Sequence, residues 1–380
     1  MSKKTRILLI TERRADYSRF KPLLKLMKYD LKIDYKIVVT GSHLLKSHGY
    51  TINEIKKDKF KIFKKIKNFH NLRKNSAINM ISSMGIVFTK LSNIFNKYKP
   101  DIVVTGFDIG ANFALTVCAA HLNIPIAHIQ GGEVTGSIDE SLRHAMSKFA
   151  NYHLVANQDA KKRLIKMGEL KKNIFIVGCP SLDALKDVKE VNLKEMSKKF
   201  NFNFFEKFAC LIQHPVTTEK NLSKKQILQT LKGIKKIDIP TFAIMPNNDA
   251  GYEDIIKEIK YSKIKWTKNL SLSEYKSVLK NCNLLIGNSS SGIHEAATYK
   301  VPVINIGSRQ NRRLKSKNVI DVNYNSNEIS KKIKIVLSSQ FRKKLKNLKN
   351  PYGDGKSALR MIKILKNINI KENTQKTITY

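Results

Sequence analysis

The sequence predicts an α/β fold made of two Rossmann-like domains that face a cleft, and three observations support this prediction. Short apolar runs that end in turn residues alternate with amphipathic helical patterns, as is typical of parallel sheets covered by helices. The same alternation begins again in the second half of the chain. A chain of 380 residues with 42% hydrophobic content is long enough for two cores. We therefore expect functional side chains to follow strands, where ligands of such sheets bind.

The first half of the chain supplies strands and helices in turn. The run RILLIT at 6–11 predicts a strand, and the amphipathic segment at 16–29 predicts the helix after it. Further strands are predicted at 34–42, 101–108 and 124–133, with a helix at 109–123 between the last two. This order is that of repeated βαβ units, which form a doubly wound parallel sheet.

The second half repeats the pattern after a lysine-rich helix. Its strands are predicted at 208–216, 240–248, 283–292 and 301–309. The hinge should lie near 183–200, so that 1–182 form the N-terminal domain and 183–355 a C-terminal nucleotide-binding domain. We expect the last helix, at about 356–370, to return to the first domain, and 371–380 to form a flexible tail.

Composition excludes several classes of function. The formal net charge is +41, but only 12 of the 71 basic residues are arginine, and the lysines are spread over predicted helix surfaces. With no basic stripe that includes aromatic residues, we expect no nucleic-acid partner. No run of eighteen apolar residues or cleavable signal pattern is present, so we expect a cytoplasmic protein without a membrane partner. The four cysteines are far apart and predict reduced core thiols.

The segment LLIGNSSSGIHEAA at 284–297 combines a strand end, a small polar loop and a helix start. Its small residues are Ser289, Ser290, Ser291 and Gly292. Backbone N–H groups and serine hydroxyls at such a turn can converge on an anion, whereas an ordinary helix cap needs only one such residue. The loop therefore favours phosphate binding. Glu295, in the following helix, is either a ribose-binding carboxylate or an ordinary helix residue.

Acidic residues gather after two strands of the first domain. The stretch at 128–149 contains Glu133, Asp139, Glu140 and Arg143 after a double glycine. Helix capping can account for Asp139 or Glu140, and helical pairing for Arg143, but neither accounts for Glu133. Asp108 ends the strand at 101–108, where it is either a helix cap or a functional acid. The position of ligands at strand ends favours function.

Histidines and arginines also follow strands. His214 ends a predicted strand and precedes a proline, so its ring can project toward a ligand. His43 ends another strand. Arg14, Arg309 and Arg313 follow strands as well and can bind phosphate bidentately, unless they are ordinary surface charges. No His or Cys pair has the spacing of metal ligands, so we expect neither a metal ion nor a cofactor.

Several segments taken together resemble the hydrolysing UDP-N-acetylglucosamine 2-epimerases, including the epimerase half of the animal bifunctional enzyme. They are TERRADYSRFKPLL, VVTGSHL, HIQGGEVTGSIDESLRHAMSKF, IQHPVTTE, PNNDAGY, IGNSSSG, GSRQNRR and YGDG. The resemblance runs from about Arg6 to Leu365. It implies a GT-B-like fold, a nucleotide-sugar substrate and a homodimer or homotetramer.

The resemblance also implies roles for single residues. The family's catalytic groups match Asp108, Glu133, Asp139 and His214, with Glu140 and Arg143 in the same motif. Its substrate contacts match Arg14, His43, His153, Ser289, Ser290, Ser291, Gly292, Glu295, Arg309 and Arg313. One departure concerns the neighbours of Asp108. The family usually has Gly-Asp-Arg and an acid three positions after the Asp, whereas this chain has Phe107, Ile109 and Ala111.

The implied reaction converts UDP-N-acetylglucosamine and water to N-acetylmannosamine and UDP, through elimination of UDP and hydration of a glycal. Carboxylates beside the sugar can move protons while basic and hydroxyl groups hold the diphosphate. Three alternatives stay open. The same reaction could use a UDP- or GDP-linked diacetamido-bacillosamine, for legionaminic rather than N-acetylneuraminic acid. A GT-B glycosyltransferase would need an acceptor, and a silent nucleotide-sugar-binding protein would turn nothing over.

Overall fold

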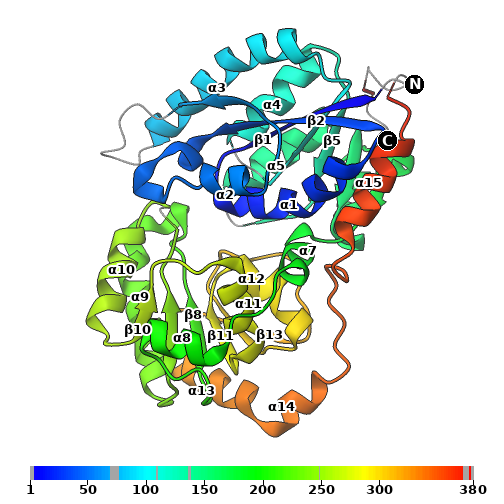
Figure 1. Cartoon of the computed structure of the whole chain (residues 1–380). Helices are drawn as coiled ribbons and strands as arrows, with labels where there is room; N and C mark the ends of the chain where they lie inside the picture. The colour runs from blue at the N-terminus through cyan, green and yellow to red at the C-terminus, as the bar shows by residue number, and fades with distance from the viewer. Residues whose placement is uncertain are drawn as a thin grey trace. The chain divides into compact units, whose positions relative to one another are not determined.

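The computed structural model describes residues 4–68, 77–107, 110–135, 138–247, 249–370 and 376–377. The chain forms two compact units. Unit 1 comprises Met1–Glu133, Ile138–Ala184 and Gly355–Tyr380, and unit 2 comprises Val134–Ser137 and Leu185–Asp354. Each unit contains one parallel β-sheet that helices cover on both faces (Figure 1).

Unit 1 contains a seven-stranded parallel sheet with the order β3-β2-β1-β4-β5-β6-β7. The strands are β1 Thr5–Thr11, β2 Ile33–Thr40, β3 Ile62–Ile66, β4 Ile102–Gly106, β5 Ile126–Ile129, β6 Tyr152–Val155 and β7 Ile174–Ile176. The helices are α1 Arg14–Tyr29, α2 Ile52–Lys57, α3 Ala77–Tyr98, α4 Gly110–His121, α5 Ile138–Phe149, α6 Gln158–Lys166 and α15 Ser357–Asn367. Helix α7 Pro180–Asp187 begins in unit 1 and ends in unit 2. Short 3₁₀ turns span Gly41–Leu44, Lys46–His48 and Lys171–Asn173. The strand order changes direction between β1 and β4.

Strand β1 shows that the first sheet is buried on both faces. Ile7 and Leu9 belong to one core cluster, while Leu8 and Ile10, which alternate with them, belong to another. All four are almost completely buried. A strand with helices on both sides needs a continuous apolar run rather than an alternating one, and RILLIT supplies it.

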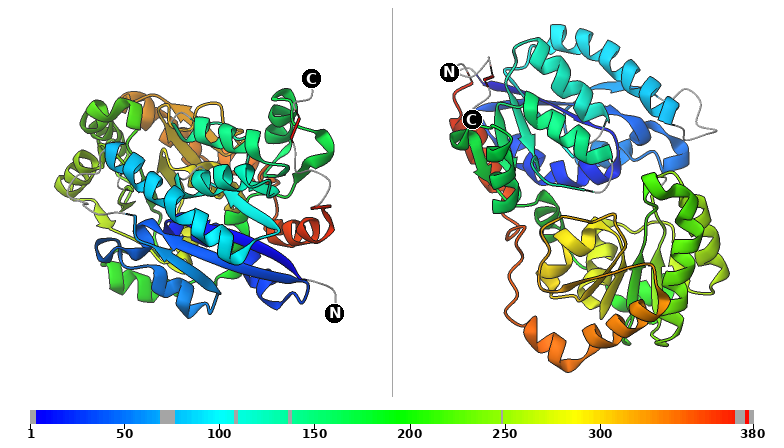
Figure 2. Two further views of the ribbon diagram at one scale, coloured as in Figure 1. Left: turned by 90° about the horizontal axis from the view of Figure 1, so that it is seen from above. Right: turned by 180° about the vertical axis from the view of Figure 1, so that it is seen from behind.

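Helix α15 packs in unit 1 although all of unit 2 precedes it in the sequence. Ala358, Met361 and Leu365 are buried in the core cluster that also contains apolar residues of α1. The N–H groups of Ser357 and Ala358 donate to the carboxylate of Asp183 at 3.0 and 2.8 Å. Both views in Figure 2 show this helix, in red, against the first sheet's unit.

Unit 2 contains a six-stranded parallel sheet with the order β10-β9-β8-β11-β12-β13. The strands are β8 Ala209–Ile212, β9 Thr241–Ile244, β10 Lys265–Thr267, β11 Leu284–Gly287, β12 Val303–Ile306 and β13 Val319–Val322. The helices are α8 Leu193–Phe200, α9 Ser223–Lys235, α10 Tyr252–Tyr261, α11 Leu272–Asn281, α12 Ser290–His294, α13 Ser326–Leu337 and α14 Ser339–Lys344. Short 3₁₀ turns span Thr217–Leu222 and Ala296–Tyr299.

The structure confirms the predicted α/β class with two Rossmann-like units. In both sheets the strand order reverses beside the first strand of the unit, between β1 and β4 and between β8 and β11. Ligands of doubly wound sheets bind outside the carboxyl ends of the strands at this reversal. Residues that follow these four strands are therefore the first candidates for a functional site.

Two further features concern the thiols and the helices. Cys118, Cys179, Cys210 and Cys282 are all unpaired, and the last three are buried. Burial raises the pKa of the Cys179 thiol to about 11. In the part of the chain that the structure describes, no helix combines the length and the apolar character that crossing a membrane requires.

Candidate active site

Polar residues follow the central strands of the first sheet at its carboxyl edge. Glu12 follows β1, and Gln130 and Glu133 follow β5. Parallel strands end at the same edge of a sheet, so these residues lie on one side of unit 1. Asp108, the acid that the sequence singles out after β4, lies outside the described residues.

Glu133 is held in a buried turn after β5. Only 5% of the residue is exposed, and its Oε1 accepts a hydrogen bond from Gln130 Nε2 at 3.0 Å. Its carbonyl accepts a second one from Arg143 Nη1 at 2.8 Å. Gly132 makes the turn possible, because its φ is +76° and a Cβ there would lie 2.6 Å from a carbonyl oxygen. The turn thus fixes a carboxylate at the sheet edge, where it can exchange a proton with a ligand.

Helix α5 carries the other acids that the sequence predicts for the site. Asp139 and Glu140 lie half-buried in its first turn, where the helix dipole favours carboxylates. Arg143 lies one turn later, is buried, and directs its guanidinium to the carbonyl of Glu133. His144 Nε2 lies 3.8 Å from Glu140 Oε1. The structure therefore brings Glu133 and Arg143 into contact and places both acids on the same helix as Arg143.

Two predicted binding residues near β1 have partners within the chain. Arg14 begins α1, and its Nε lies 3.3 Å from Glu54 Oε1 in a partly exposed ion pair. His43 is fully buried, and its two ring nitrogens lie 3.0 Å from Thr11 Oγ1 and 2.7 Å from Thr51 Oγ1. Burial lowers the pKa of its imidazole. The neutral ring braces the ends of β1 and β2 and uses both nitrogens to do so.

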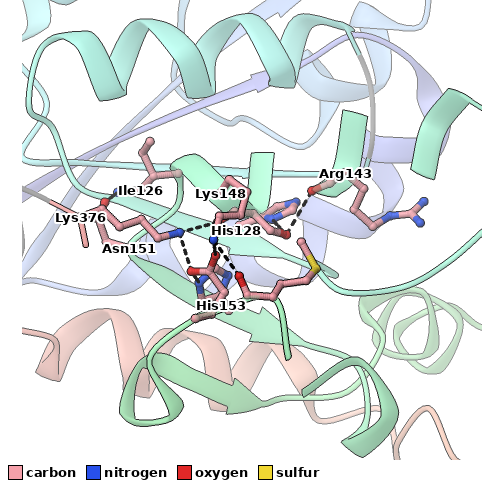
Figure 3. A network of polar contacts seen from close by, with 10 residues as sticks. Ile126, His128, Arg143, Lys148, Asn151, His153 and Lys376 are labelled. Carbon is pink, nitrogen blue, oxygen red and sulfur yellow. Dashed lines mark hydrogen bonds and ion pairs between the residues drawn. The ribbon is translucent and has the colours of Figure 1, made fainter. Parts of the chain in front are cut away.

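His153 lies in a buried polar network that joins β6, the end of α5 and the C-terminal segment (Figure 3). Its Nε2 lies 3.0 Å from Glu169 Oε2, and both side chains are only 1% exposed. Lys148 Nζ lies 2.9 Å from Glu169 Oε1, and Lys376 Nζ lies 2.5 Å from Oε2. Lys376 also donates to the carbonyl of Ser147 at 2.7 Å. The structure therefore gives His153 partners inside unit 1.

The cationic side chains of this network surround one buried carboxylate. Burial alone would raise the pKa of Glu169, but hydrogen bonds from His153, Lys376 and Lys148 outweigh it and lower the pKa to about 2. Burial lowers the pKa of His153. A neutral histidine and two lysines thus surround an ionised glutamate, an arrangement that stabilises the end of α5.

In unit 2, His214 follows β8 and is joined to the loop after β11. Its backbone N–H donates to Asn288 Oδ1 at 2.7 Å, and Asn288 Nδ2 donates to its carbonyl at 2.8 Å. The N–H of Asn247 donates to the ring Nδ1 of His214 at 3.2 Å. Three hydrogen bonds from two other strand ends therefore fix both the backbone and the ring of this histidine.

The electrostatics of His214 define what its ring can do. Burial, with Arg309 nearby, lowers the pKa of its imidazole well below the usual 6.5, so the ring is neutral. Because Nδ1 accepts a hydrogen bond, the ring proton resides on Nε2. No residue that the structure describes bonds to Nε2. A neutral imidazole whose N–H has no partner among the described residues can donate a hydrogen bond to a ligand.

The loop after β11 has the geometry of an anion-binding turn. Gly287 has φ +126°, and a Cβ there would lie 2.0 Å from the carbonyl oxygen of Ile212, so only glycine fits between β8 and β11. Ser289 caps α12, and its Oγ accepts the N–H of Ser291 at 3.3 Å. Ser290 is half-buried, and no described residue bonds to its hydroxyl. The hydroxyl of Ser290 is therefore available to an anion at the start of a helix.

The remaining residues of this motif pack against the chain itself. A Cβ at Gly292 would lie 2.8 Å from Val303 Cγ1, so this glycine lets α12 lie close to β12. The hydroxyls of Ser291 and Tyr275 are hydrogen-bonded. Burial, with Glu295 nearby, raises the pKa of Tyr275 well above its usual range. Tyr275 of α11 thus connects two predicted ligand residues, Ser291 and Glu295.

The two arginines after β12 turn in different directions. Arg309 Nη1 and Gln310 Nε2 donate to the carbonyl of Asn288 at 3.2 and 2.9 Å, beside the serine loop. Arg313 Nε donates to the carbonyl of Val134 at 2.9 Å, in the short segment that groups with unit 2. Arg309 therefore contacts the loop that carries the serines and Asn288, the partner of His214.

The two sheet edges differ in chemistry. The first holds carboxylates and an arginine, which suits proton transfer. The second holds a neutral imidazole, hydroxyls, amides and a guanidinium, which suits an anion such as a diphosphate. Within the ranges that the structure describes, no three His, Cys, Asp or Glu side chains gather as metal ligands do.

Sequence reasoning missed four residues of these edges. Gln130 bonds to Glu133, Asn288 joins His214 to the serine loop, and Tyr275 bonds to Ser291. Glu12 is the fourth. Glu12, Gln130 and Asn288 are polar residues that follow strands, and Asn288 directly precedes the serine run, whereas Tyr275 lies within α11. Only the three-dimensional pairing separates them from ordinary polar residues.

Fold and site together define the class of the protein as an α/β protein with a GT-B-like fold. The model of the family UDP-N-acetylglucosamine 2-epimerase matches residues 25–366. The chain belongs to the hydrolysing UDP-N-acetylglucosamine 2-epimerase family, as its sequence motifs predict.

Curated relatives cover nearly the whole chain. The UDP-N,N′-diacetylbacillosamine 2-epimerase (hydrolyzing) of Legionella pneumophila is 37% identical over 368 residues, which are 96% of each chain. The UDP-N-acetylglucosamine 2-epimerase of Neisseria meningitidis serogroup B is 33% identical over 330 residues, or 85% of each. A GDP/UDP-N,N′-diacetylbacillosamine 2-epimerase (hydrolyzing) of Campylobacter jejuni is also 33% identical, again over 85% of each.

Solved structures share the fold. The crystal structure of UDP-GlcNAc 2-epimerase from Neisseria meningitidis bound to UDP-GlcNAc superposes with a TM-score of 0.83 at 18% identity, over 96% of this chain and all of that one. The Methanocaldococcus jannaschii enzyme in complex with UDP-GlcNAc and UDP gives 0.75 at 23% identity, over 96% and 99%. Identities this low support the fold alone.

Proposed function

We propose that this chain converts a UDP-linked 2-acetamido sugar and water to the free 2-epimer and UDP, with UDP-N,N′-diacetylbacillosamine as the first candidate substrate. The observation that carries this choice is the 37% identity to the diacetylbacillosamine epimerase over 96% of both chains. UDP-N-acetylglucosamine is the second candidate, because the relative named UDP-N-acetylglucosamine 2-epimerase is 33% identical. Both substrates undergo the same reaction.

The chemistry of the two edges supports this proposal. Elimination of UDP leaves negative charge on the diphosphate, which Ser290, Arg309 and the ring Nε2–H of His214 can stabilise. Removal of the hydrogen at carbon 2 needs a positioned base, and the acids of the first edge, Glu133 and Asp139, are of the required type. We include Asp108 among these acids because it ends the strand that the sequence predicts at 101–108. Water then adds at carbon 1 of the glycal and gives the free sugar.

Labelling tests the proposed route. In deuterium oxide the released sugar should carry deuterium at carbon 2, because elimination removes the original hydrogen and solvent supplies its replacement. In oxygen-18 water the label should enter carbon 1 of the sugar and not the UDP, read promptly before anomeric exchange. Epimerised sugar that retains its original hydrogen would contradict the elimination route, and release without epimerisation would indicate simple hydrolysis.

A competition experiment tests the substrate. The protein is incubated with equal concentrations of UDP-N,N′-diacetylbacillosamine, its GDP analogue and UDP-N-acetylglucosamine, without an acceptor. The free sugars and nucleotides are identified by mass spectrometry and NMR. We expect the highest kcat/KM for the UDP-linked diacetamido sugar. A higher value for UDP-N-acetylglucosamine would reverse our order, and turnover only with an added acceptor would indicate a glycosyltransferase.

We also propose a homodimer or homotetramer, which rests on the resemblance alone. Light scattering at the concentration used for the assays should give twice or four times the chain mass of 43.4 kDa. A strict monomer with full activity would overturn this part of the proposal.

A further inference from the structure

Glu12 is a carboxylate at the reversal of the first sheet that no sequence motif assigns to the site. It follows β1 directly and is half-buried. β1 is the strand beside which the order of the sheet changes direction, and β4 is its neighbour on the other side of the reversal. Ligands of doubly wound sheets bind at this position.

The backbone of Glu12 is fixed by hydrogen bonds from both sides. Its N–H donates to Asp16 Oδ2 at 2.9 Å. Its carbonyl accepts hydrogen bonds from Ser42 Oγ at 3.1 Å and from the N–H of His43 at 3.4 Å. Three contacts to α1 and to the turn after β2 leave this residue little freedom. Such restraint is what an acid–base group needs in order to act without reorganisation.

The side chain of Glu12 is oriented as well. Its Oε2 accepts a hydrogen bond from the N–H of Ala111, in the first turn of α4, at 3.1 Å. Gly41 makes room for it: φ at this glycine is +61°, and a Cβ there would lie 2.3 Å from Glu12 Cγ. No hydrogen bond to Oε1 is found from any residue that the structure describes. One oxygen is therefore anchored, and the other has no hydrogen bond from the described residues.

The surroundings of Glu12 favour a carboxyl group that keeps its proton. Burial raises its pKa above the usual 4.5, and the charge of Asp16 acts in the same direction. Arg13 and the N–H of Ala111 act in the opposite direction but do not outweigh burial. Arg13 is the N-cap residue of α1, Asp16 lies in the first turn of that helix, and His43, which faces from the turn after β2, is neutral. An acid with a raised pKa suits proton transfer near neutral pH.

We propose that Glu12 is a further acid–base residue of the sugar site, with Oε1 as the atom that touches the sugar. This inference rests on the proposed function. The competing explanation is that Glu12 only caps the first turn of α4 through Ala111, in which case its charge and its proton would not matter to turnover. The two explanations differ in what a neutral, isosteric side chain at position 12 would do.

Glu12→Gln separates the two explanations. The amide oxygen of glutamine can still accept the N–H of Ala111, so the cap remains, but the side chain can no longer ionise. We expect the melting temperature and KM to stay near those of the wild type, while kcat falls at least about tenfold. The pH profile of kcat should also lose one ionisation. Glu195→Gln, at an exposed position of α8, is the matched control.

Unchanged kcat and an unchanged pH profile in Glu12→Gln would overturn the inference and leave the proposed function intact. Glu12→Ala removes the cap as well. If Glu12→Gln matches the wild type while Glu12→Ala loses stability and activity together, Glu12 is only a cap.

A second measurement does not depend on turnover. In protein labelled with carbon-13 at glutamate carboxyls, the signal missing from Glu12→Gln belongs to Glu12. We expect it to titrate above the ordinary glutamate range and to shift when the UDP-linked sugar is added. If the wild type releases no epimerised sugar, the proposed function fails by itself. If the Glu12 carboxyl signal does not shift when the nucleotide sugar is added, the proposed role of Glu12 is overturned.

Discussion

The carboxyl edges of the two sheets have the same topology and different chemistry. The first edge holds Glu12 and Glu133 on fixed turns, with Arg143 against one of them. The second holds the neutral ring of His214 and a serine loop, joined by Asn288. The strand order reverses in both sheets. The backbone thus decides where a site lies, and the residues that follow the strands decide what it does.

His153 and His214 extend this comparison to single side chains. Both are buried, and burial lowers the pKa of both. The Nε2 of His153 contacts Glu169 inside unit 1, whereas Nε2 of His214 has no partner among the described residues. Burial therefore does not distinguish a structural histidine from a functional one. The set of partners around the ring does.

The largest expected effect comes from removing one group at each edge. We expect Glu133→Gln and His214→Ala each to reduce kcat at least about a hundredfold, since each removes an acid–base or charge-stabilising group. Asp108→Asn should do the same if the prediction from the sequence is right. Steady-state kinetics with the nucleotide sugar measure all three.

Exposed residues of the same types provide the controls for these variants. His121→Ala, at the exposed end of α4, should leave kcat unchanged. Wild-type turnover in Glu133→Gln would remove that residue from the mechanism. Wild-type turnover in His214→Ala would end the distinction between the two buried histidines.

A smaller effect, in substrate binding, should appear at the second edge. Ser290→Ala combined with Arg313→Gln should raise KM about tenfold with a smaller change in kcat, because uniform phosphate binding is lost. Arg312→Gln is the matched control, since Arg312 is the exposed neighbour. The single variants divide the effect between the serine loop and Arg313, whose Nε contacts Val134. If KM stays the same, the diphosphate is not bound there.

The Glu169 network should affect stability more than turnover. Folding lowers the pKa of Glu169 from the usual 4.5 to about 2, so its contribution to stability is present above about pH 4.5 and is lost as the pH falls toward 2. Lys376→Gln should reduce the free energy of unfolding by about 1 kcal/mol at pH 7. Because the substitution raises the folded-state pKa of Glu169, the loss of stability in acid should be smaller and should end at a higher pH.

Urea unfolding at a series of pH values measures both effects. Lys363→Gln, an exposed lysine of α15, is the control. A large loss of kcat in Lys376→Gln at unchanged stability would contradict our assignment of this network, and of His153, to structure.

The last prediction is that removal of metal ions does not change the activity. Activity should persist in excess EDTA, because arginine, hydroxyl and amide groups carry the diphosphate in our proposal. Loss of activity that added magnesium restores would show that the second edge needs a cation in addition to its own donors.

The fold could be predicted because the central strands are continuous apolar runs, which only a sheet covered on both faces can bury. The edge strands could not be found in this way. β3 (IFKKI) and β10 (KWT) are short, lysine-containing and half exposed, so their pairing depends on neighbours rather than on composition. The pattern that finds a buried strand is absent where one side of the strand meets solvent.

The candidate site was predictable where a strand end and a residue type coincide, as at Glu133 and His214. It was not predictable where function depends on a partner far away in sequence. Nothing in the sequence indicates that Glu12 meets Ala111 or that Tyr275 meets Ser291. Gly292 shows the reverse problem, because its small size is explained by packing against Val303 as well as by a nearby phosphate.

The return of α15 to unit 1 has a consequence for how the chain folds as it is synthesised. Ala358, Met361 and Leu365 complete the core of the unit that begins with β1, and Lys376 completes the network at the end of α5. These residues are synthesised after all of unit 2. Unit 2, which ends at Asp354, can therefore complete its core before the final helix of unit 1 has been synthesised. A chain truncated directly after Asp354 would thus contain all of unit 2 but lack the last helix of unit 1.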